Sequence, residues 1–238
     1  MTNCLLASTS TIFGGNYLDY LFDELGELYQ DTEEVIFIPF ARPGGISHDA
    51  YSKIATTAFQ HIGKKIIGLH TFDEPGAALK TAKGIFTGGG NSFVLVDSLY
   101  RHQLMAPLRQ VVLDGTPYLG TSAGSNIAGP SIKTTNDMPI VYPSSYDTLG
   151  ITPININPHY LDPDPNSTHK GETRETRIKE FHEFNTTAVI GLREGSWIRV
   201  QDKKTTLQGG RLSARIFEKG KDAYEIPAGA SLDFLKNG

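Results

Sequence analysis

The amino-acid sequence predicts an α/β fold, in which a mostly parallel sheet has helices on both faces and is followed by C-terminal β-hairpins. Short continuous apolar runs alternate with stretches of helical periodicity through the first half of the chain. That pattern is typical of a parallel sheet buried on both sides. Glycine-rich turns stand where two of the apolar runs end, at 88–91 and 120–124. Sites in such folds form at the carboxyl ends of the strands, so these turns are candidate site loops.

Each predicted element has a local signal. Leu18, Leu21, Leu25 and Leu28 recur at helical spacing, whereas 34–39 is β-branched and aromatic and ends in proline. The predicted strands cover 4–8, 34–39, 65–69, 84–87, 117–119, 153–160 (a strand that ends in a loop) and 188–192, and the predicted helices cover 17–29, 49–62, 77–80, 92–101, 106–113 and 169–184. Turn sequences at 202–204 and 219–222 predict the C-terminal hairpins.

Composition limits the classes of protein to consider. The 238 residues suffice for one sizeable core, and we expect a single domain, 1–238. A net charge of −4 without any Lys/Arg-rich run argues against a nucleic-acid partner. The single Cys4 excludes an internal disulfide and a cysteine-clustered zinc site. Because neither a signal peptide nor a membrane-length apolar stretch is found, we expect a cytoplasmic protein without a membrane partner.

The turn 120–124 has the pattern Gly-x-Ser-x-Gly, with Ser122 at its centre. It follows an apolar run, and a helix is expected to open at 126–128. A serine between two glycines at a strand-to-helix turn can project its hydroxyl from the sheet as a nucleophile, and the N–H of Ala123 can supply half of an oxyanion hole. The alternative is a turn of small residues where a helix and a strand pack closely.

A serine nucleophile needs a base and a group that orients the base. Of the seven histidines, His159 stands at a predicted strand end downstream of Ser122, and Glu194 also follows a strand. In the alternative interpretation, His159 is an exposed loop residue and Glu194 is a surface acid paired with Arg193. The turn 88–91 can offer backbone N–H groups to an anion, but it lacks the patterns of dinucleotide and P-loop sites.

Taken together, these motifs resemble those of peptidase E, the α-aspartyl dipeptidases, across essentially the whole chain. The segments that carry the resemblance, in order, are 37–41, 88–91, 120–124, 134–139, 155–159, 169–174 and 194–197. The resemblance implies a Ser-His-Glu triad and a flavodoxin-like fold similar to class I glutamine amidotransferase domains. It also implies cleavage of dipeptides that begin with aspartate, with a small peptide as the partner. We expect no metal or cofactor, and a monomer or homodimer.

Carried over by position, Ser122 is the nucleophile, His159 the base and Glu194 its orienting group, while Gly89 and Ala123 are the oxyanion donors. The turn departs from the resemblance at two positions. Thr121 and Ser125 stand where related members have Trp and Ala, which bears on fine specificity more than on the reaction.

Two charges of such a substrate need partners. A guanidinium reads a side-chain carboxylate by charge and by shape, and Arg174 is the candidate, with His169 and Asn91 as auxiliaries. Asp137 is the candidate for the free α-ammonium group. The alternatives are a solvated arginine on a helix surface and an aspartate that caps a turn.

Two other classes of function remain to be considered. A glutaminase-like amidotransferase on a similar fold would carry a cysteine at the nucleophile position, where this chain has Ser122, whereas Cys4 begins the first strand. A binding module without chemistry would not need Ser122, His159 and Glu194 together.

Overall fold

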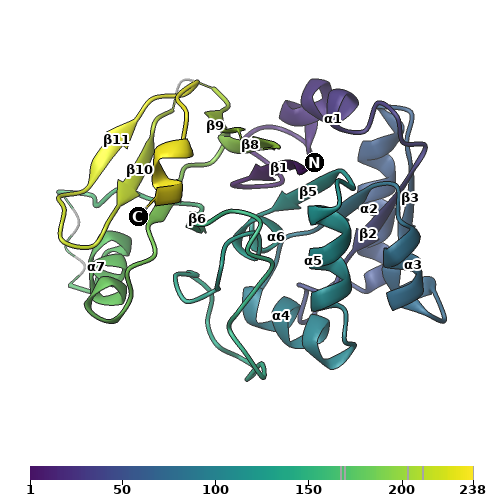
Figure 1. Ribbon diagram of the computed structural model, residues 1–238, viewed down its shortest axis with the longest axis horizontal. Coiled ribbons are helices and arrows are strands. Elements are labelled where there is room, and N and C mark those ends of the chain that lie inside the picture. Colours follow the sequence, from purple (N-terminus) through teal and green to yellow (C-terminus); the bar gives the residue numbers. More distant parts are fainter. Residues whose placement is uncertain (167, 169, 203, 211, 238) are drawn as a thin grey trace.

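The computed structural model describes residues 1–166, 168, 170–202, 204–210 and 212–237. It is an α/β fold built around a seven-stranded sheet of order β3-β2-β4-β5-β1-β8-β9 (Figure 1). The strands of this sheet are β1 (Asn3–Ala7), β2 (Glu34–Ile38), β3 (Lys65–Gly68), β4 (Ile85–Thr87), β5 (Tyr118–Thr121), β8 (Trp197–Gln201) and β9 (Lys204–Gln208). The neighbouring pairs from β3 to β1 are parallel, whereas β8 and β9 add antiparallel.

Helices cover both faces of this sheet, as predicted. Along β1, Leu5 and Ala7 pack on one side and Cys4 and Leu6 on the other, because successive side chains of a strand point to opposite faces. The first side is covered by α1 (Phe22–Leu28) and α2 (His48–Gln60), and the second by α3 (Pro75–Thr81), α4 (Ser92–Arg101) and α5 (Met105–Leu113). Short 3₁₀ turns lie at Asp19–Leu21, Leu69–Thr71 and Asp233–Asn237.

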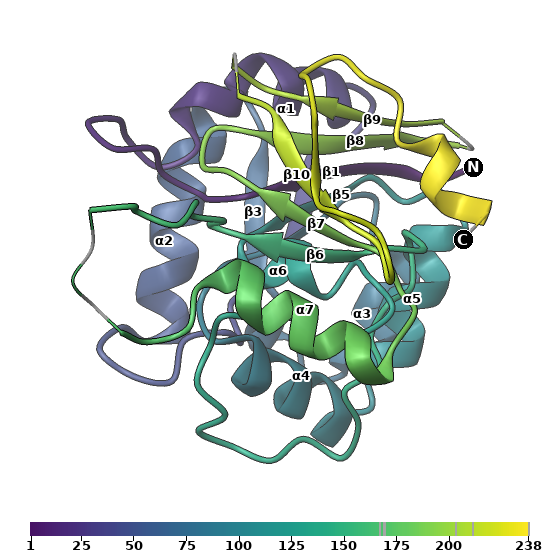
Figure 2. The same cartoon turned by 90° about the vertical axis from the view of Figure 1, so that its left-hand side faces the viewer.

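A second sheet of order β11-β10-β7-β6 stands beside the first (Figure 2). Its strands are β6 (Asn155–Pro158), β7 (Val189–Leu192), β10 (Ala214–Phe217) and β11 (Tyr224–Ile226). The helix α7 (Arg174–Phe184) packs on this sheet through Ile178. Both C-terminal hairpins are present, as β8–β9 and β10–β11. The first of them pairs with β1, which leaves β6 and β7 no edge of the main sheet beside β1 and places them in a sheet of their own.

Several element boundaries differ from the prediction. Residues 17–29 do not form one helix, because Leu18 takes a left-handed φ of 62° and α1 begins only at Phe22. The helix α7 begins at Arg174 and not near 169, since the Thr173 hydroxyl accepts the Thr176 N–H and caps it there. The helix after Ser122, α6, spans Ala123–Asn126, so it ends where the sequence suggested that it opens.

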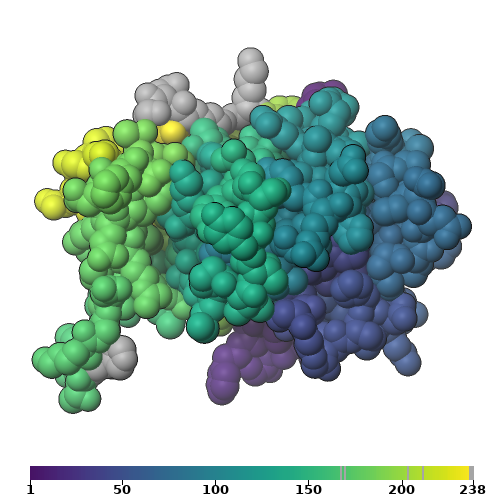
Figure 3. All heavy atoms as spheres, turned by 90° about the horizontal axis from the view of Figure 1, so that it is seen from below, coloured from purple at the N-terminus to yellow at the C-terminus, as the bar shows by residue number. Residues whose placement is uncertain are grey.

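The segment between α6 and β6 contains no other described helix or long strand. Its two ends are buried in the core, whereas its middle, with Met138, Ile140 and Tyr142, is exposed. Lys133 Nζ donates to Asn185 Oδ1 at 3.3 Å, which ties the segment to the C-cap of α7. Figure 3 shows them side by side, in teal and green, on the face seen from below. Within the described ranges, no helix combines the length and the apolar character that crossing a bilayer requires.

Candidate active site

Ser122 lies at the turn from β5 to α6 with φ 52° and ψ −112°, a conformation that non-glycine residues rarely adopt. Its N–H donates to the Ala7 carbonyl at 3.1 Å, and its own carbonyl accepts the N–H groups of Ser125 and Asn126 at 2.9 Å each. A Cβ at Gly124 would lie 2.2 Å from the Thr87 carbonyl oxygen. The turn therefore needs glycine at 124, and the surrounding backbone holds Ser122 in this strained geometry.

The two departures from the family pattern are both buried around this turn. The Ser125 hydroxyl lies within hydrogen-bonding distance of the carbonyl oxygens of Ala7, at 2.6 Å, and Gly120, at 2.7 Å. The Thr121 hydroxyl has no partner among the described residues. Ser125 thus links the strands that carry the turn.

His159 follows β6 and lies within reach of Ser122. Its Nε2 is 2.8 Å from Ser122 Oγ, and its Nδ1 is 2.6 Å from Glu194 Oε1. The His159 backbone has a left-handed φ of 53°, and its N–H donates to Ser8 Oγ at 2.8 Å. The Ser8 hydroxyl in turn donates to the Leu192 carbonyl at 2.7 Å, so Ser8 connects β1, β6 and β7 behind the imidazole.

Glu194 follows β7 and is not paired with Arg193. The Arg193 guanidinium binds Asp162 with both Nε and Nη2, at 2.9 and 2.7 Å, and also binds Glu225 at 2.9 Å. Glu194 is therefore free to accept the hydrogen bond of His159. Arg193 links the end of β7 to Asp162 and to Glu225 on β11.

The ion pairs of Arg193 predict an acid-sensitive contribution to stability. Its hydrogen bonds to Glu225 hold the pKa of that carboxyl at about 2, below the ordinary value of 4.5. A depressed carboxyl pKa contributes stability above the unfolded value and loses it as pH falls through the folded value. We expect wild type to be more stable than Glu225→Gln at about pH 6, with the difference shrinking between pH 4.5 and about 2. Denaturant unfolding across this range tests it, with Glu34→Gln at the exposed Lys65 pair as the control. A difference independent of pH would contradict the assignment.

The turn 88–91 lies directly against Ser122. A Cβ at Gly89 would be 3.0 Å from Ser122 Cβ and 3.6 Å from its Oγ. Within the described part of the chain, the N–H groups of Gly89 and Ala123 donate to no protein acceptor. Both amides are thus available to donate to a substrate carbonyl oxygen that gains negative charge beside Ser122.

A cavity of about 180 Å³ opens in front of these groups. It brings together the nucleophile candidate, the base candidate and polar side chains from three segments of the chain. Its lining residues are Ser92, Ser122, Ala123, Thr135, Asn136, Asp137, Pro158, His159 and Arg174.

Arg174 enters this cavity as the first residue of α7. Its Nη1 makes a long hydrogen bond of 3.4 Å to the Pro158 carbonyl, and the described residues offer it no ion pair. Burial lowers the pKa of this guanidinium, and the charge of Glu194 opposes that shift. By contrast, Arg177 on the same helix lies at the surface and pairs with Glu172 at 3.7 Å. A partly buried guanidinium without a carboxylate, facing a small cavity, is suited to a carboxylate ligand.

Asp137 lines the same cavity and also caps a helix. Its Oδ2 accepts the Ser92 N–H at 2.7 Å, at the start of α4, and the Thr135 hydroxyl at 3.1 Å. Its Oδ1 accepts no hydrogen bond from the described residues. Asp137 therefore caps the start of α4 and not a turn of its own segment, and its Oδ1 is left for a ligand within the described residues.

The two auxiliary candidates are placed differently. Asn91 is the N-cap of α4: its Oδ1 accepts the Val94 N–H at 3.1 Å and its Nδ2 donates to the Met138 carbonyl at 2.9 Å. It does not line the cavity, and a role in substrate binding remains a prediction. His169 lies outside the described residues. The structure adds Asn136, which sequence reasoning missed: its Nδ2 donates to the Pro158 carbonyl at 2.9 Å beside His159.

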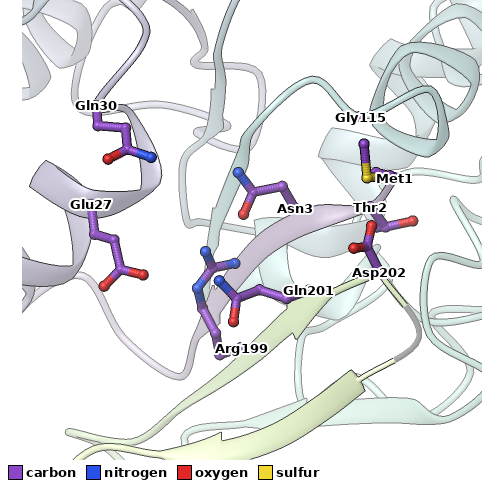
Figure 4. A pocket seen from close by; sticks show the side chains of 9 residues that line it. All are labelled: Met1, Thr2, Asn3, Glu27, Gln30, Gly115, Arg199, Gln201 and Asp202. Carbon is purple, nitrogen blue, oxygen red and sulfur yellow. The ribbon is translucent and has the colours of Figure 1, made fainter.

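A second cavity, of about 290 Å³, lies at the other end of the strands, where β1 begins (Figure 4). Arg199, Glu27 and Asn3 line it, and none of the side chains around Ser122 does. Cys4, on β1, is fully buried, and burial raises the pKa of its thiol to about 12. It therefore offers no thiolate nucleophile to an amidotransferase mechanism. The described residues contain no group of three or more His, Cys, Asp or Glu side chains that could hold a metal ion.

Comparisons with known proteins identify the family of this chain and relatives of similar fold. A model of peptidase family S51 matches residues 4–208. Peptidase E of Streptomyces coelicolor is 46% identical over 233 residues, which cover 98% of this chain and 94% of that protein. A Drosophila melanogaster protein named "Probable alpha-aspartyl dipeptidase" is 44% identical over 236 residues, covering 98% and 97%. In fold, the chain is similar to the crystal structure of a peptidase from an acI-B1 actinobacterium, with a TM-score of 0.69 at 18% identity, covering 98% and 96%.

Proposed function

The chain belongs to peptidase family S51, and from that premise we propose that Ser122, His159 and Glu194 form its catalytic triad. The observation that carries the proposal is the pair of hydrogen bonds through the imidazole, 2.8 Å to the Ser122 hydroxyl and 2.6 Å to the Glu194 carboxylate. A serine hydroxyl becomes a nucleophile when a base accepts its proton and a third group fixes that base. This arrangement supports serine-type hydrolysis more directly than it supports a binding module.

The substrate of this reaction is a dipeptide with an N-terminal aspartate. A relative named "Probable alpha-aspartyl dipeptidase" covers almost the whole chain, and two residues of the cavity match the charges of such a substrate. The Arg174 guanidinium, which has no ion pair among the described residues, receives the aspartyl side-chain carboxylate, and Asp137 Oδ1 receives the α-ammonium group. A cavity of about 180 Å³ suits one small residue.

The reaction then proceeds in two stages. Ser122 attacks the carbonyl carbon of the aspartyl residue while His159 takes its proton, and the oxyanion faces the N–H groups of Gly89 and Ala123. His159 next gives the proton to the leaving amine, which leaves an acyl-enzyme. It then activates water to release aspartate, and Glu194 stabilises the imidazolium at each stage. One oxyanion donor contributes about 3–4 kcal/mol of transition-state stabilisation.

The same geometry supports one domain over 1–238. Ser122 extends from the main sheet, whereas His159 and Glu194 follow strands of the second sheet. Ser8 follows β1 of the main sheet, and its hydroxyl bonds across this junction to the backbone of Leu192 and His159 on the side of the second sheet. The two sheets must therefore dock for the site to exist, so neither is an independent functional unit.

A dipeptide panel tests the proposed specificity. We expect rapid hydrolysis of Asp-Leu, and rates lower by about a hundredfold or more for Asn-Leu. Without the substrate carboxylate, the Arg174 guanidinium has no counter-charge in the site. Glu-Leu should also react slowly, since its carboxylate overshoots when the scissile carbonyl is held at Ser122. N-acetyl-Asp-Leu removes the ammonium group that Asp137 is proposed to bind. Chromatographic product analysis gives the rates. Equal rates for Asp-Leu and Asn-Leu would exclude an aspartate-specific site.

A further inference from the structure

Tyr51, a residue of α2, reaches beneath the glycine turn 88–91. Its side chain is 1% exposed, and its hydroxyl donates to the Gly89 carbonyl at 3.1 Å. A Cβ at Gly88 would lie 2.6 Å from the Tyr51 hydroxyl oxygen, so the hydroxyl packs directly against the turn. The ring is held edge-on by Phe37, at 4.9 Å between centroids, and the Arg42 guanidinium lies 4.9 Å from its centre. The Tyr51 side chain is thus held firmly in place beneath a turn made mostly of glycine.

The turn needs such a support because its three glycines have no side chains to fix them, and the Asn91 side chain bonds away from them, to Val94 and Met138. Its two ends are fixed by the backbone: the Gly88 N–H donates to the Ile38 carbonyl at 3.2 Å, and the Asn91 N–H donates to the Ala41 carbonyl at 2.7 Å. Between them, the N–H groups of Gly89 and Gly90 donate to no acceptor in the described ranges. Glycine peptides rotate easily, so unpaired amides in this position have no intrinsic direction.

We propose that Tyr51 is a positioning residue for the oxyanion hole, which it preorganises by fixing the peptide group between Gly89 and Gly90. In a trans peptide the carbonyl and the following N–H point in opposite directions. The bond from Tyr51 therefore turns the Gly90 N–H away from the tyrosine and restricts the rotation of Gly89, which lies against Ser122. The Gly89 N–H, the proposed oxyanion donor, belongs to the preceding peptide, so Tyr51 acts on it by anchoring the residue that carries it. The inference rests on the proposed serine mechanism.

The effect should fall on the transition state and not on substrate binding. Charge develops on the carbonyl oxygen only as Ser122 attacks, so loosened donors lower kcat while the contacts of Arg174 and Asp137 keep KM. Removing an oxyanion donor outright costs about a hundredfold to a thousandfold in kcat. For Tyr51→Phe, which leaves the donors present but less fixed, we expect kcat for Asp-Leu to fall about ten- to a hundredfold and KM to change less than about threefold.

Tyr29→Phe is a matched control. Tyr29 is also fully buried, and its hydroxyl donates to a backbone carbonyl, that of Ile85, at 2.7 Å. Ile85 begins β4, the strand that leads into the same turn, but the Tyr29 hydroxyl bonds to the start of that strand and not to the turn. Each variant loses one oxygen atom and one tyrosine-to-carbonyl hydrogen bond, and Tyr51→Phe also loses a long bond of 3.5 Å from the Tyr17 hydroxyl. We therefore expect thermal stability to fall in both variants, and somewhat more in Tyr51→Phe. Only Tyr51→Phe should lose kcat.

The experiment measures kcat and KM for Asp-Leu, the melting temperature, and the rate at which a fluorophosphonate reacts with Ser122. The fluorophosphonate adduct places its own oxygen in the oxyanion hole, so Tyr51→Phe should react more slowly than wild type and than Tyr29→Phe. If both variants retain equal kcat and equal labelling rates, Tyr51 only stabilises the fold and the inference is overturned. A wild-type protein that neither hydrolyses Asp-Leu nor reacts with the probe would overturn the serine mechanism, and this inference with it.

Discussion

Ser122→Ala and His159→Ala are each expected to abolish hydrolysis of Asp-Leu, with a loss of about a millionfold in kcat, because nucleophile and base act as a unit. Both variants should stay folded. The Ser122 side chain bonds only to His159 among the described residues, and its backbone is held by Ala7, Ser125 and Asn126. Steady-state rates and circular dichroism, measured on the same preparations, test the two halves of the expectation.

Glu194→Gln should be less severe than either. The amide can still occupy the position 2.6 Å from His159 Nδ1, but it stabilises the imidazolium less well and favours the wrong tautomer. The double variant Ser122→Ala/Glu194→Gln should then be no slower than Ser122→Ala alone. A folded Ser122→Ala protein with near wild-type activity would refute the whole mechanism.

Arg174→Ala is expected to lower kcat/KM for Asp-Leu about a hundredfold or more, and to change the slow hydrolysis of Asn-Leu far less. The guanidinium is partly buried and has no ion pair in the described part of the chain, so the substrate carboxylate would be its counter-charge. An amide in place of that carboxylate leaves little for the arginine to recognise. The informative quantity is the ratio of the two losses, measured with both substrates on both proteins.

Arg177→Ala supplies the control on the same helix. Arg177 lies at the surface and pairs with Glu172, so its loss should affect neither substrate. If Arg174→Ala instead reduces Asp-Leu and Asn-Leu hydrolysis equally, Arg174 supports the structure through the Pro158 carbonyl. The carboxylate pocket would then have to be sought elsewhere.

Much of the main sheet could be predicted from local pattern. The runs at 34–39 and 65–69 are confirmed as β2 and β3 within one residue, because a strand buried on both faces is a short apolar stretch with clear ends. The second sheet could not be predicted. Whether β6 and β7 join the main sheet depends on whether the β8–β9 hairpin occupies the edge beside β1, and that is a contact between distant parts of the chain.

In the candidate site, too, some features could be predicted from local sequence and others depend on contacts between distant parts of the chain. Ser122, His159 and Glu194 each stand at or near the end of a predicted strand, so their positions could be recognised, while their chemical roles remain predictions. Tyr51 carried no such signal, because a tyrosine on a predicted helix is ordinary core material until the turn above it is seen. Ser8 was visible only as a small polar residue after the first strand. Its role as a link between β1, β6 and β7 depends on tertiary contacts.

The division of the triad between two sheets also bears on the order in which the chain is made. A nascent chain that has emerged through α6 already contains Ser122, the glycine turn 88–91 and Tyr51, but it lacks both the imidazole and the carboxylate. A serine hydroxyl without a base is a poor nucleophile, so Ser122 of the growing chain would not attack a peptide substrate. His159 and Glu194 are synthesised only with the strands of the second sheet. Ser8 is among the first residues synthesised, and its hydroxyl can bind the backbone of His159 only after that sheet has formed. Under the proposed mechanism, the chain therefore cannot hydrolyse its substrate until β6 and β7 have been synthesised and the second sheet has docked on the main sheet.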